Sequence, residues 1–235
     1  MSPSIPHLSP EGAGPLPADH SAAYARFKAD ERANQLTHGL GLALSLAGAG
    51  FLCRHVCLHG DAWQITGCLV FSAALVAVYA ASTLSHSFET IRLRHFFRTL
   101  DQVCIFLLIA GTYTPFGLKY LRTPGAMALL VAIWILAVAG IVSKLFVTRL
   151  KNVATAFYVL LGWLPILAIK SILEHVPGQV LGLALAGGFF YTVGTYFLTH
   201  DNRRLYFHAW WHVMVMAGSA CHYLAVLLFV ADWRP

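Results

Sequence analysis

Apolar residues occur along this chain in seven runs whose lengths suit membrane-spanning α-helices. About 20 consecutive apolar residues cross a hydrocarbon core of about 30 Å. The runs cover residues 36–53, 62–84, 103–118, 126–145, 153–173, 178–198 and 209–230. The third run is short, and Gly111, Thr112, Thr114 and Pro115 near its end predict a kink or an early helix end. The pattern predicts an all-α, polytopic membrane protein with a seven-transmembrane-helix bundle.

The composition agrees with a membrane protein. Hydrophobic residues make up 58% of the 235, charged residues 11%, and the mean hydropathy is +0.66. The net charge of +6 does not indicate nucleic acid as a partner, because the distribution of Lys and Arg matters more than their sum in a membrane protein. Residues 1–25 are rich in Pro, Ser, Gly and Ala and are predicted to be a flexible cytoplasmic tail. Residues 26–235 are predicted to form the transmembrane domain.

Lys and Arg lie mainly on one side of the predicted bundle. Of these 16 residues, 11 lie before the first span or between spans two and three, four and five, or six and seven. Short loops rich in Lys and Arg stay in the cytoplasm. The distribution therefore predicts a cytoplasmic N-terminus and, after seven crossings, a C-terminus outside.

The last apolar run carries three histidines, and ionisable residues at membrane depth indicate function by default. His208 and His212 are four residues apart, so on a helix they lie about 40° apart and roughly 6 Å along the axis. Both can reach one ion, although such a pair alone is also typical of histidines that hydrogen-bond to neighbours. His222 lies roughly 15 Å deeper, which favours a buried hydrogen-bonding residue over a ligand.

Two other spans bring polar residues to the same level. The second span ends inside with Ser82 and His86, and the third begins inside with Asp101. The predicted topology thus places His86, Asp101, His208 and His212 together. Three imidazoles with an open fourth position are the pattern of catalytic zinc, and a nearby carboxylate could orient and deprotonate the bound water. For Asp101 alone, a favourable contact with the helix N-terminus is the alternative.

The entry to the first span carries Glu31, Asn34, Thr37 and His38 within about two helical turns. For Glu31 and Asn34, one interpretation is a capped helix N-terminus with an acidic first turn. The other is a set of residues that support the metal ligands. His38 is interpreted either in that supporting role or as a satisfied interfacial histidine. Cysteines and histidines also alternate over residues 53–59, where a second metal site or an ordinary interfacial helix end would explain them.

Taken together, these motifs resemble the hemolysin III family, the bacterial branch of the progestin and adipoQ receptor (PAQR) superfamily. The resemblance covers about residues 31–226, and its motifs are Glu31-x-x-Asn34-x-x-Thr37-His38, Ser82-x-x-x-His86, Leu100-Asp101 followed by AGTYTPF, Gly162-Trp163, Gly188-x-x-Tyr191-x-x-Gly194, and His208-x-x-x-His212 with Gly218 and His222. The resemblance implies a seven-helix, multi-pass protein of the bacterial inner (plasma) membrane. It also implies an intramembrane zinc ion bound by His86, His208 and His212, with Asp101 and Ser82 contacting the zinc-bound water or its surroundings.

The resemblance to ceramidase-like relatives implies a zinc-dependent hydrolase of lipid amide or ester bonds that acts in membrane lipid homeostasis. Asp101 would serve as the general base and Ser82 would donate a hydrogen bond to the developing oxyanion, with membrane lipids as the partners. A non-enzymatic membrane sensor or receptor-like protein with structural zinc is the alternative. Cytolytic pore formation is disfavoured, because no span shows a repeated polar face that would line an aqueous pore. The substrate and the oligomeric state stay open.

Overall fold

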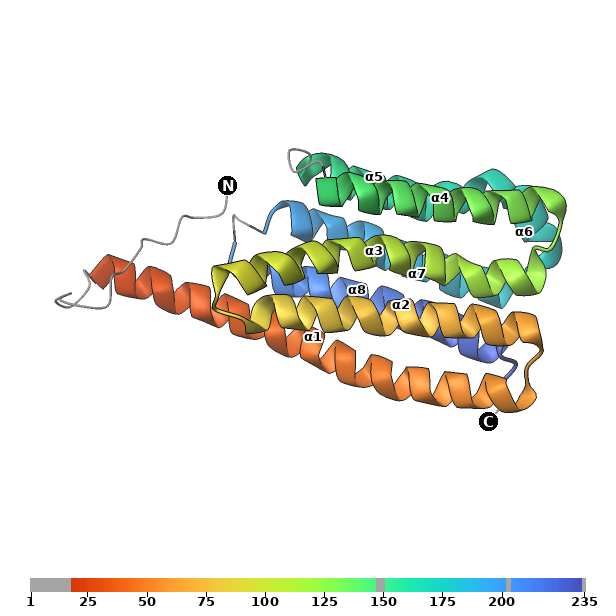
Figure 1. Cartoon of the computed structure of the whole chain (residues 1–235), viewed down its shortest axis with the longest axis horizontal. Coiled ribbons are helices and arrows are strands. Elements are labelled where there is room, and N and C mark those ends of the chain that lie inside the picture. Colours follow the sequence, from red (N-terminus) through yellow and green to blue (C-terminus); the bar gives the residue numbers. More distant parts are fainter. Residues whose placement is uncertain (1–17, 147–150, 202–203, 234–235) are drawn as a thin grey trace.

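The computed structural model describes residues 18–146, 151–201 and 204–233, and within these ranges the chain forms helices joined by short connections (Figure 1). The elements in chain order are α1 (Ala18–His59), α2 (Ala62–Ser87), α3 (Ile91–Tyr120), α4 (Pro124–Phe146), α5 (Lys151–Trp163), the 3₁₀-helix η1 (Leu164–Ala168), α6 (Ile169–His175), α7 (Gly178–Thr199), α8 (Phe207–Ala225) and the π-helical η2 (Val226–Val230). Seven helical segments are long and apolar enough to cross a membrane, and the fifth combines α5, η1 and α6. The predicted all-α bundle and its number of spans are confirmed.

The spanning helices lie side by side, roughly along the long axis of the molecule (Figure 1). The α2–α3 and α7–α8 connections lie at one end, which we call the N-terminal end of the bundle, and the first turns of α1 extend beyond it. The described chain finishes at the opposite end. Helix α2 packs between α1 and α3, while α8 packs against α1 and α7. Helix α1, the α2–α3 connection and the α7–α8 connection are far apart in the sequence, and they therefore meet at the N-terminal end of the bundle.

Two apolar clusters hold the bundle together. The larger joins α1, α2, α3 and α8 and includes Leu52 and Phe71, while the smaller joins α3, α4 and α5 around Phe106 and Ile133. The outward faces also carry large apolar side chains, such as Leu36, which is 73% exposed. Exposed apolar surface of this extent is expected where lipid rather than water surrounds the helices.

Helices α1 and α3 begin well before the apolar runs that revealed them. Helix α1 already starts at Ala18, so the predicted tail is helical over residues 18–25, and its first part, 1–17, lies outside the described residues. Helix α3 starts at Ile91, so the predicted basic loop with Arg92, Arg94 and Arg98 is in fact the start of that helix. Asp101 and Glu31 consequently lie about three turns or more inside their helices. The alternative in which each stabilises a helix N-terminus is therefore wrong.

Helix α3 also continues past the residues that were expected to end it. Pro115 lies inside the helix, which ends only at Tyr120. Of the two predicted alternatives, the early helix end is thus wrong, and the kink stays a prediction. Neighbouring helices and hydroxyl side chains allow proline inside a membrane helix because they satisfy the backbone.

The fifth span is the interrupted one. Its α-helical part gives way to η1, which has Pro165 in its first turn. The Tyr113 hydroxyl from α3 donates to the Gly162 carbonyl, and Trp163 Nε1 donates to Thr192 Oγ1 of α7 at 3.0 Å. The interruption therefore joins α5 to both α3 and α7.

Candidate metal centre and adjoining cavity

Three histidines from two helices converge at the N-terminal end of the bundle. His86 lies in the last turn of α2, His208 in the first turn of α8, and His212 one turn further along α8. One ring nitrogen from each lies within 4.8 Å of the others. Among the residues that the structure describes, they form the one group of three or more His, Cys, Asp or Glu side chains with this geometry. The predicted convergence of these ligands is observed.

Each histidine uses its Nδ1 atom in a hydrogen bond to a neighbouring oxygen. His86 Nδ1 lies 3.0 Å from Glu31 Oε2, and an ionised carboxylate only accepts hydrogen bonds. Nδ1 of His86 therefore carries the proton, and its Nε2 has the free lone pair. The other Glu31 oxygen accepts from Arg98 Nη2 at 3.5 Å. Glu31 thereby joins α1 to His86 of α2 and to Arg98 of α3.

His212 is oriented by a hydroxyl group. Its Nδ1 lies 3.1 Å from Thr37 Oγ1, and the Thr37 proton is directed to the carbonyls of Ala33 and Asn34 at 2.8 and 3.0 Å. Thr37 consequently accepts from His212 Nδ1–H, which leaves Nε2 unprotonated. His212 is fully buried, and its Nε2 has no hydrogen-bond partner among the described residues. A buried lone pair without a partner is what a metal ligand should present before the ion binds.

His208 has its partner in the connection before α8. Its Nδ1 lies 3.0 Å from Asp201 Oδ2. The connection ends at Tyr206, which has φ of 65° and caps α8. The backbone N–H of Tyr206 donates to Asp30 Oδ1 of α1 at 2.7 Å. The left-handed turn is therefore secured by α1, and it starts α8 where His208 can face the other two histidines.

These three contacts give the triad the hydrogen-bond pattern of a histidine metal site. A metal-ligating histidine commonly donates its other ring N–H to a carboxylate or another oxygen, and this fixes the tautomer that binds. Two carboxylates and a hydroxyl do so here, so three Nε2 lone pairs are available. The residues present therefore fit a divalent ion that prefers imidazole, with zinc among the candidates.

Asp101 and Ser82 are the two residues predicted to assist catalysis, and this role stays a prediction. The Asp101 carboxyl group interacts electrostatically with His208 and is close to Ser82. The Ser82 hydroxyl oxygen is fully buried and makes no hydrogen bond within 3.5 Å among the described residues. Asp101 is half-buried and lines a cavity that runs from the site into the bundle. A carboxylate that interacts with His208 thus faces an internal space, with the buried Ser82 hydroxyl close to it.

Two further predicted residues, Asn34 and His38, lie on the same face of α1 and are buried. The His38 ring lies against that of His212, with centroids 3.5 Å apart, and neither of its nitrogens has a described partner. Asn34 Oδ1 is also buried without a partner. His38 is therefore a neighbour of the ligands that faces the cavity, and it is not a satisfied interfacial histidine.

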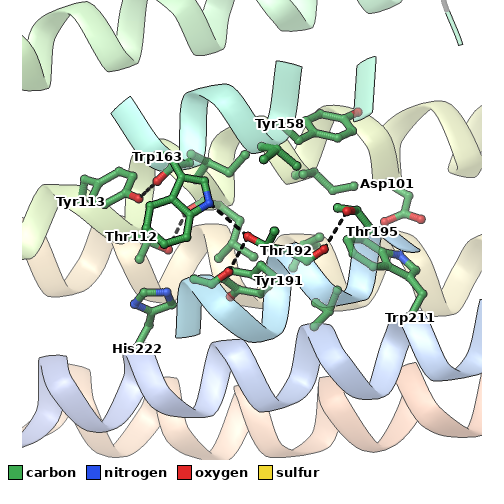
Figure 2. Close-up of a pocket in the computed structure, with 18 of the residues that line it drawn as sticks. Asp101, Thr112, Tyr113, Tyr158, Trp163, Tyr191, Thr192, Thr195, Trp211 and His222 are labelled. Carbon is green, nitrogen blue, oxygen red and sulfur yellow. Dashed lines mark hydrogen bonds between the residues drawn. The ribbon is translucent and has the colours of Figure 1, made fainter. Parts of the chain in front are cut away.

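The cavity extends from Asp101 to His222 between α3, α5, α7 and α8 (Figure 2). Figure 2 shows the two residues at opposite ends. The walls between them are mostly apolar and include five large aromatic side chains, those of Tyr113, Tyr158, Trp163, Tyr191 and Trp211. His222 is 5% exposed and lies outside the metal-ligand group. It is buried at the far end of the cavity, apart from the three candidate ligands, and the hydrogen bond predicted for it is not observed at Nδ1 among the described residues.

The alternating cysteines and histidines of residues 53–59 do not form a second metal site in the described structure. His55 Nε2 lies 3.0 Å from the Ala231 carbonyl, and His59 Nδ1 lies 3.0 Å from the His55 carbonyl. Cys53 and Cys57 are free thiols. These hydrogen bonds join the end of α1 to the end of the described chain. The alternative of an ordinary helix end therefore explains the alternating cysteines and histidines.

Comparison with known proteins identifies the family of the chain. The model of the family described as "Haemolysin-III related" matches residues 27–223. The chain belongs to this PAQR-type family. The match contains every residue of the candidate metal centre described above.

The relatives include bacterial and animal proteins. "Hemolysin-3" of Bacillus cereus is 40% identical over 206 residues, which are 87% of this chain and 94% of the relative. "Hemolysin-3 homolog" of Bacillus subtilis (strain 168) is 37% identical over 85% of this chain and 94% of its own length. "Monocyte to macrophage differentiation factor" of Homo sapiens is 29% identical over 84% and 83%. The family resemblance inferred from the motifs is confirmed, and the protein is a multi-pass membrane protein with bacterial relatives.

Sequence reasoning missed Asp201 as the partner of His208 and assigned no contact to Thr37. Asp201 lies in the short basic connection before α8, which reads as an ordinary surface loop. The signal that could have found it is a lone carboxylate seven residues before a histidine ligand. Thr37 is one of the motif residues, but its contact with His212 joins residues 175 positions apart, which spacing cannot show.

Proposed function

We propose that the protein is a zinc-dependent hydrolase of amide or ester bonds in membrane lipids. The observation that supports it most strongly is the position of Asp101, which lines the cavity (Figure 2) and interacts electrostatically with His208 of the triad. A metal held only to stabilise a fold is usually enclosed by four protein ligands. Three histidines beside a carboxylate and an internal space match the open arrangement of a catalytic site instead.

The residues of the chain can carry out each proton step. Zinc supplies a Lewis acid that polarises the carbonyl and lowers the pKa of water to about 7. Asp101 accepts the proton of the attacking water as the new C–O bond forms. It then gives that proton to the leaving amine or alkoxide as the C–N or C–O bond breaks. The Ser82 hydroxyl, which lies close to Asp101, donates its proton to the carbonyl oxygen as negative charge develops there.

The cavity supports a lipid as the substrate. Its lining of aromatic and aliphatic side chains suits an acyl chain, and its polar end at Asp101 suits the carbonyl. We place this end near the cytoplasmic leaflet, because most Lys and Arg residues lie at the N-terminal end of the bundle. The products are a fatty acid and an amine or alcohol.

The test compares Asp101→Asn and Ser82→Ala with the wild type, using purified protein and a mixed membrane-lipid extract. We expect fatty-acid release to fall about 10²–10⁴-fold in Asp101→Asn and about 10²–10³-fold in Ser82→Ala. Neither residue is among the three ligands, so the metal content should stay unchanged. Full turnover in both variants, or no turnover in a zinc-loaded wild type, would refute the hydrolase.

One observation supports a second candidate, a membrane sensor in which the ion has a structural role. Thr37 and Glu31 of α1 contact ligands on α8 and α2, and Glu31 also contacts Arg98 of α3. An ion at this point would therefore fasten four helices together. In that case Asp101→Asn and Ser82→Ala should retain function, whereas loss of a histidine ligand should abolish it.

A further inference from the structure

His222 is a buried polar residue at the far end of the cavity with a nitrogen that no described group satisfies. It is 5% exposed, and its Nδ1 atom is buried without a hydrogen-bond partner. The ring stacks on Tyr191, with centroids 5.5 Å apart and planes inclined by 21°. Buried polar atoms in native proteins nearly always have a partner, so an unpaired nitrogen beside a cavity indicates a missing ligand group.

The neighbouring hydroxyls cannot supply that partner, because they are bonded to one another. Ser219 Oγ accepts from Tyr79 at 2.9 Å and lies 3.0 Å from the Tyr191 hydroxyl. This three-residue cluster lies beside His222 and includes the ring on which His222 stacks. The imidazole is thus the group in this region that is left to interact with whatever enters the cavity.

The backbone of α7 makes room for the His222 ring. A Cβ atom at Gly187 would lie 2.5 Å from His222 Nε2, which is closer than any side chain tolerates. Only glycine at this position allows the imidazole to lie against α7 in its observed orientation. Gly182, also on α7, has no atom within 4 Å of such a Cβ. The two glycines therefore differ in their effect on His222 and offer a matched pair of variants.

The separation from the metal centre sets the length of chain that could join the two ends. His212 and His222 are ten residues apart on α8, which corresponds to roughly 15 Å along the helix axis. A fully extended chain advances about 3.3–3.6 Å over three covalent bonds, so 15 Å is spanned by about a dozen bonds. The two ends belong to one cavity, since Asp101 and His222 both line it (Figure 2).

We propose that His222 determines specificity by hydrogen-bonding a hydroxyl or keto group on the acyl chain, about a dozen bonds from the hydrolysed carbonyl. A neutral imidazole has one donor and one acceptor, so a hydroxyl can satisfy it in either tautomer. An unsubstituted chain leaves Nδ1 unpaired. This inference rests on the proposed function for the identity of the chain, and it adds the class of lipid that the cavity selects.

The test measures fatty-acid binding, which does not require turnover. Trp163 and Trp211 line the cavity, so their fluorescence reports on occupancy in purified, metal-loaded protein. The probes are stearate, 2-hydroxystearate and 12-hydroxystearate. We expect the wild type to bind 12-hydroxystearate roughly tenfold more tightly than the other two. We expect His222→Phe, which keeps an aromatic ring but has no nitrogen, to bind all three with equal affinity.

The glycine pair keeps the test decisive if His222→Phe fails to fold. Gly187→Ala should displace the imidazole and reduce the preference, whereas Gly182→Ala should retain it. Equal affinities in the wild type, no fatty-acid binding, or a preference that persists in His222→Phe or Gly187→Ala would overturn the inference. A binding preference without hydrolysis of any lipid would sustain His222 as a chain-recognition residue and refute the hydrolase. Lipid hydrolysis without a preference for 12-hydroxystearate would support the hydrolase and refute His222 as a chain-recognition residue.

Discussion

Replacing Thr37 by valine should weaken metal binding although Thr37 is not a ligand. Valine has nearly the same shape as threonine but cannot accept the hydrogen bond that His212 Nδ1 makes at 3.1 Å. A buried N–H without a partner costs about 1–3 kcal/mol. The imidazole can avoid this cost by moving its proton to Nε2, which is the nitrogen left to bind an ion. In both cases the tautomer of His212 that binds the ion, with its proton on Nδ1, becomes less favourable.

The expected loss follows from these values. A cost of about 1–3 kcal/mol corresponds to roughly 5- to 150-fold in the dissociation constant. Loss of a comparable supporting residue typically weakens metal binding by about 10–100-fold. The assay is a competition titration between detergent-solubilised protein and a chromophoric zinc chelator. Thr37→Ser, which retains the hydroxyl, should bind zinc like the wild type.

Two results would refute this reasoning. If Thr37→Val binds zinc as tightly as the wild type, the hydroxyl does not select the His212 tautomer. If Thr37→Ser is weakened as much as Thr37→Val, packing of the γ-methyl group rather than the hydrogen bond supports His212. Thermal unfolding of the metal-free proteins should accompany the titration, because a general loss of stability would appear there as well.

Further predictions concern packing, orientation and the metal. Gly67→Ala should lower the free energy of unfolding by about 1–3 kcal/mol, since its Cβ would lie 2.6 Å from the Cα of Pro115 on α3. The control Gly50→Ala, whose Cβ would have no atom within 4 Å, should leave stability unchanged. Equal melting temperatures for the two variants would contradict the prediction. The predicted orientation places the exposed Cys57 outside the cell. A membrane-impermeant maleimide should therefore label the wild type on intact cells and should not label the Cys57→Ser variant. Labelling of Cys57 only after lysis would show that the predicted orientation is wrong. Saturating zinc at about 100 times its dissociation constant should stabilise the metal-free protein by about 2.7 kcal/mol, measured as a rise in melting temperature, and an unchanged value would argue against a folded-state site.

The spans could be predicted from the sequence, but the helix ends could not. Apolar runs mark the part of a helix that lies in hydrocarbon, whereas α1 and α3 continue through charged segments to Ala18 and Ile91. This difference changed the interpretation of Glu31 and Asp101, which lie inside helices and not at their starts. Pro115 was misleading for a related reason, since bundle packing allows proline in a membrane helix.

The convergence of the three histidines could be predicted because topology alone brings the end of one span and the start of another to the same level. His86, His208 and His212 needed only the number of spans and their alternating directions. The supporting contacts needed more, because they depend on which helices are neighbours in space. Nothing in the spacing indicates that α1 lies against α8, and this contact pairs Thr37 with His212.

The metal content of the purified protein tests the central claim most directly. Elemental mass spectrometry should be applied to the wild type, to His212→Ala and to His222→Phe, each purified without added chelator. Three histidines with free Nε2 lone pairs predict about one divalent ion per chain in the wild type and in His222→Phe, and its loss in His212→Ala. An ion that persists in His212→Ala, or a wild type that contains none after incubation with zinc, would contradict the assignment of the site.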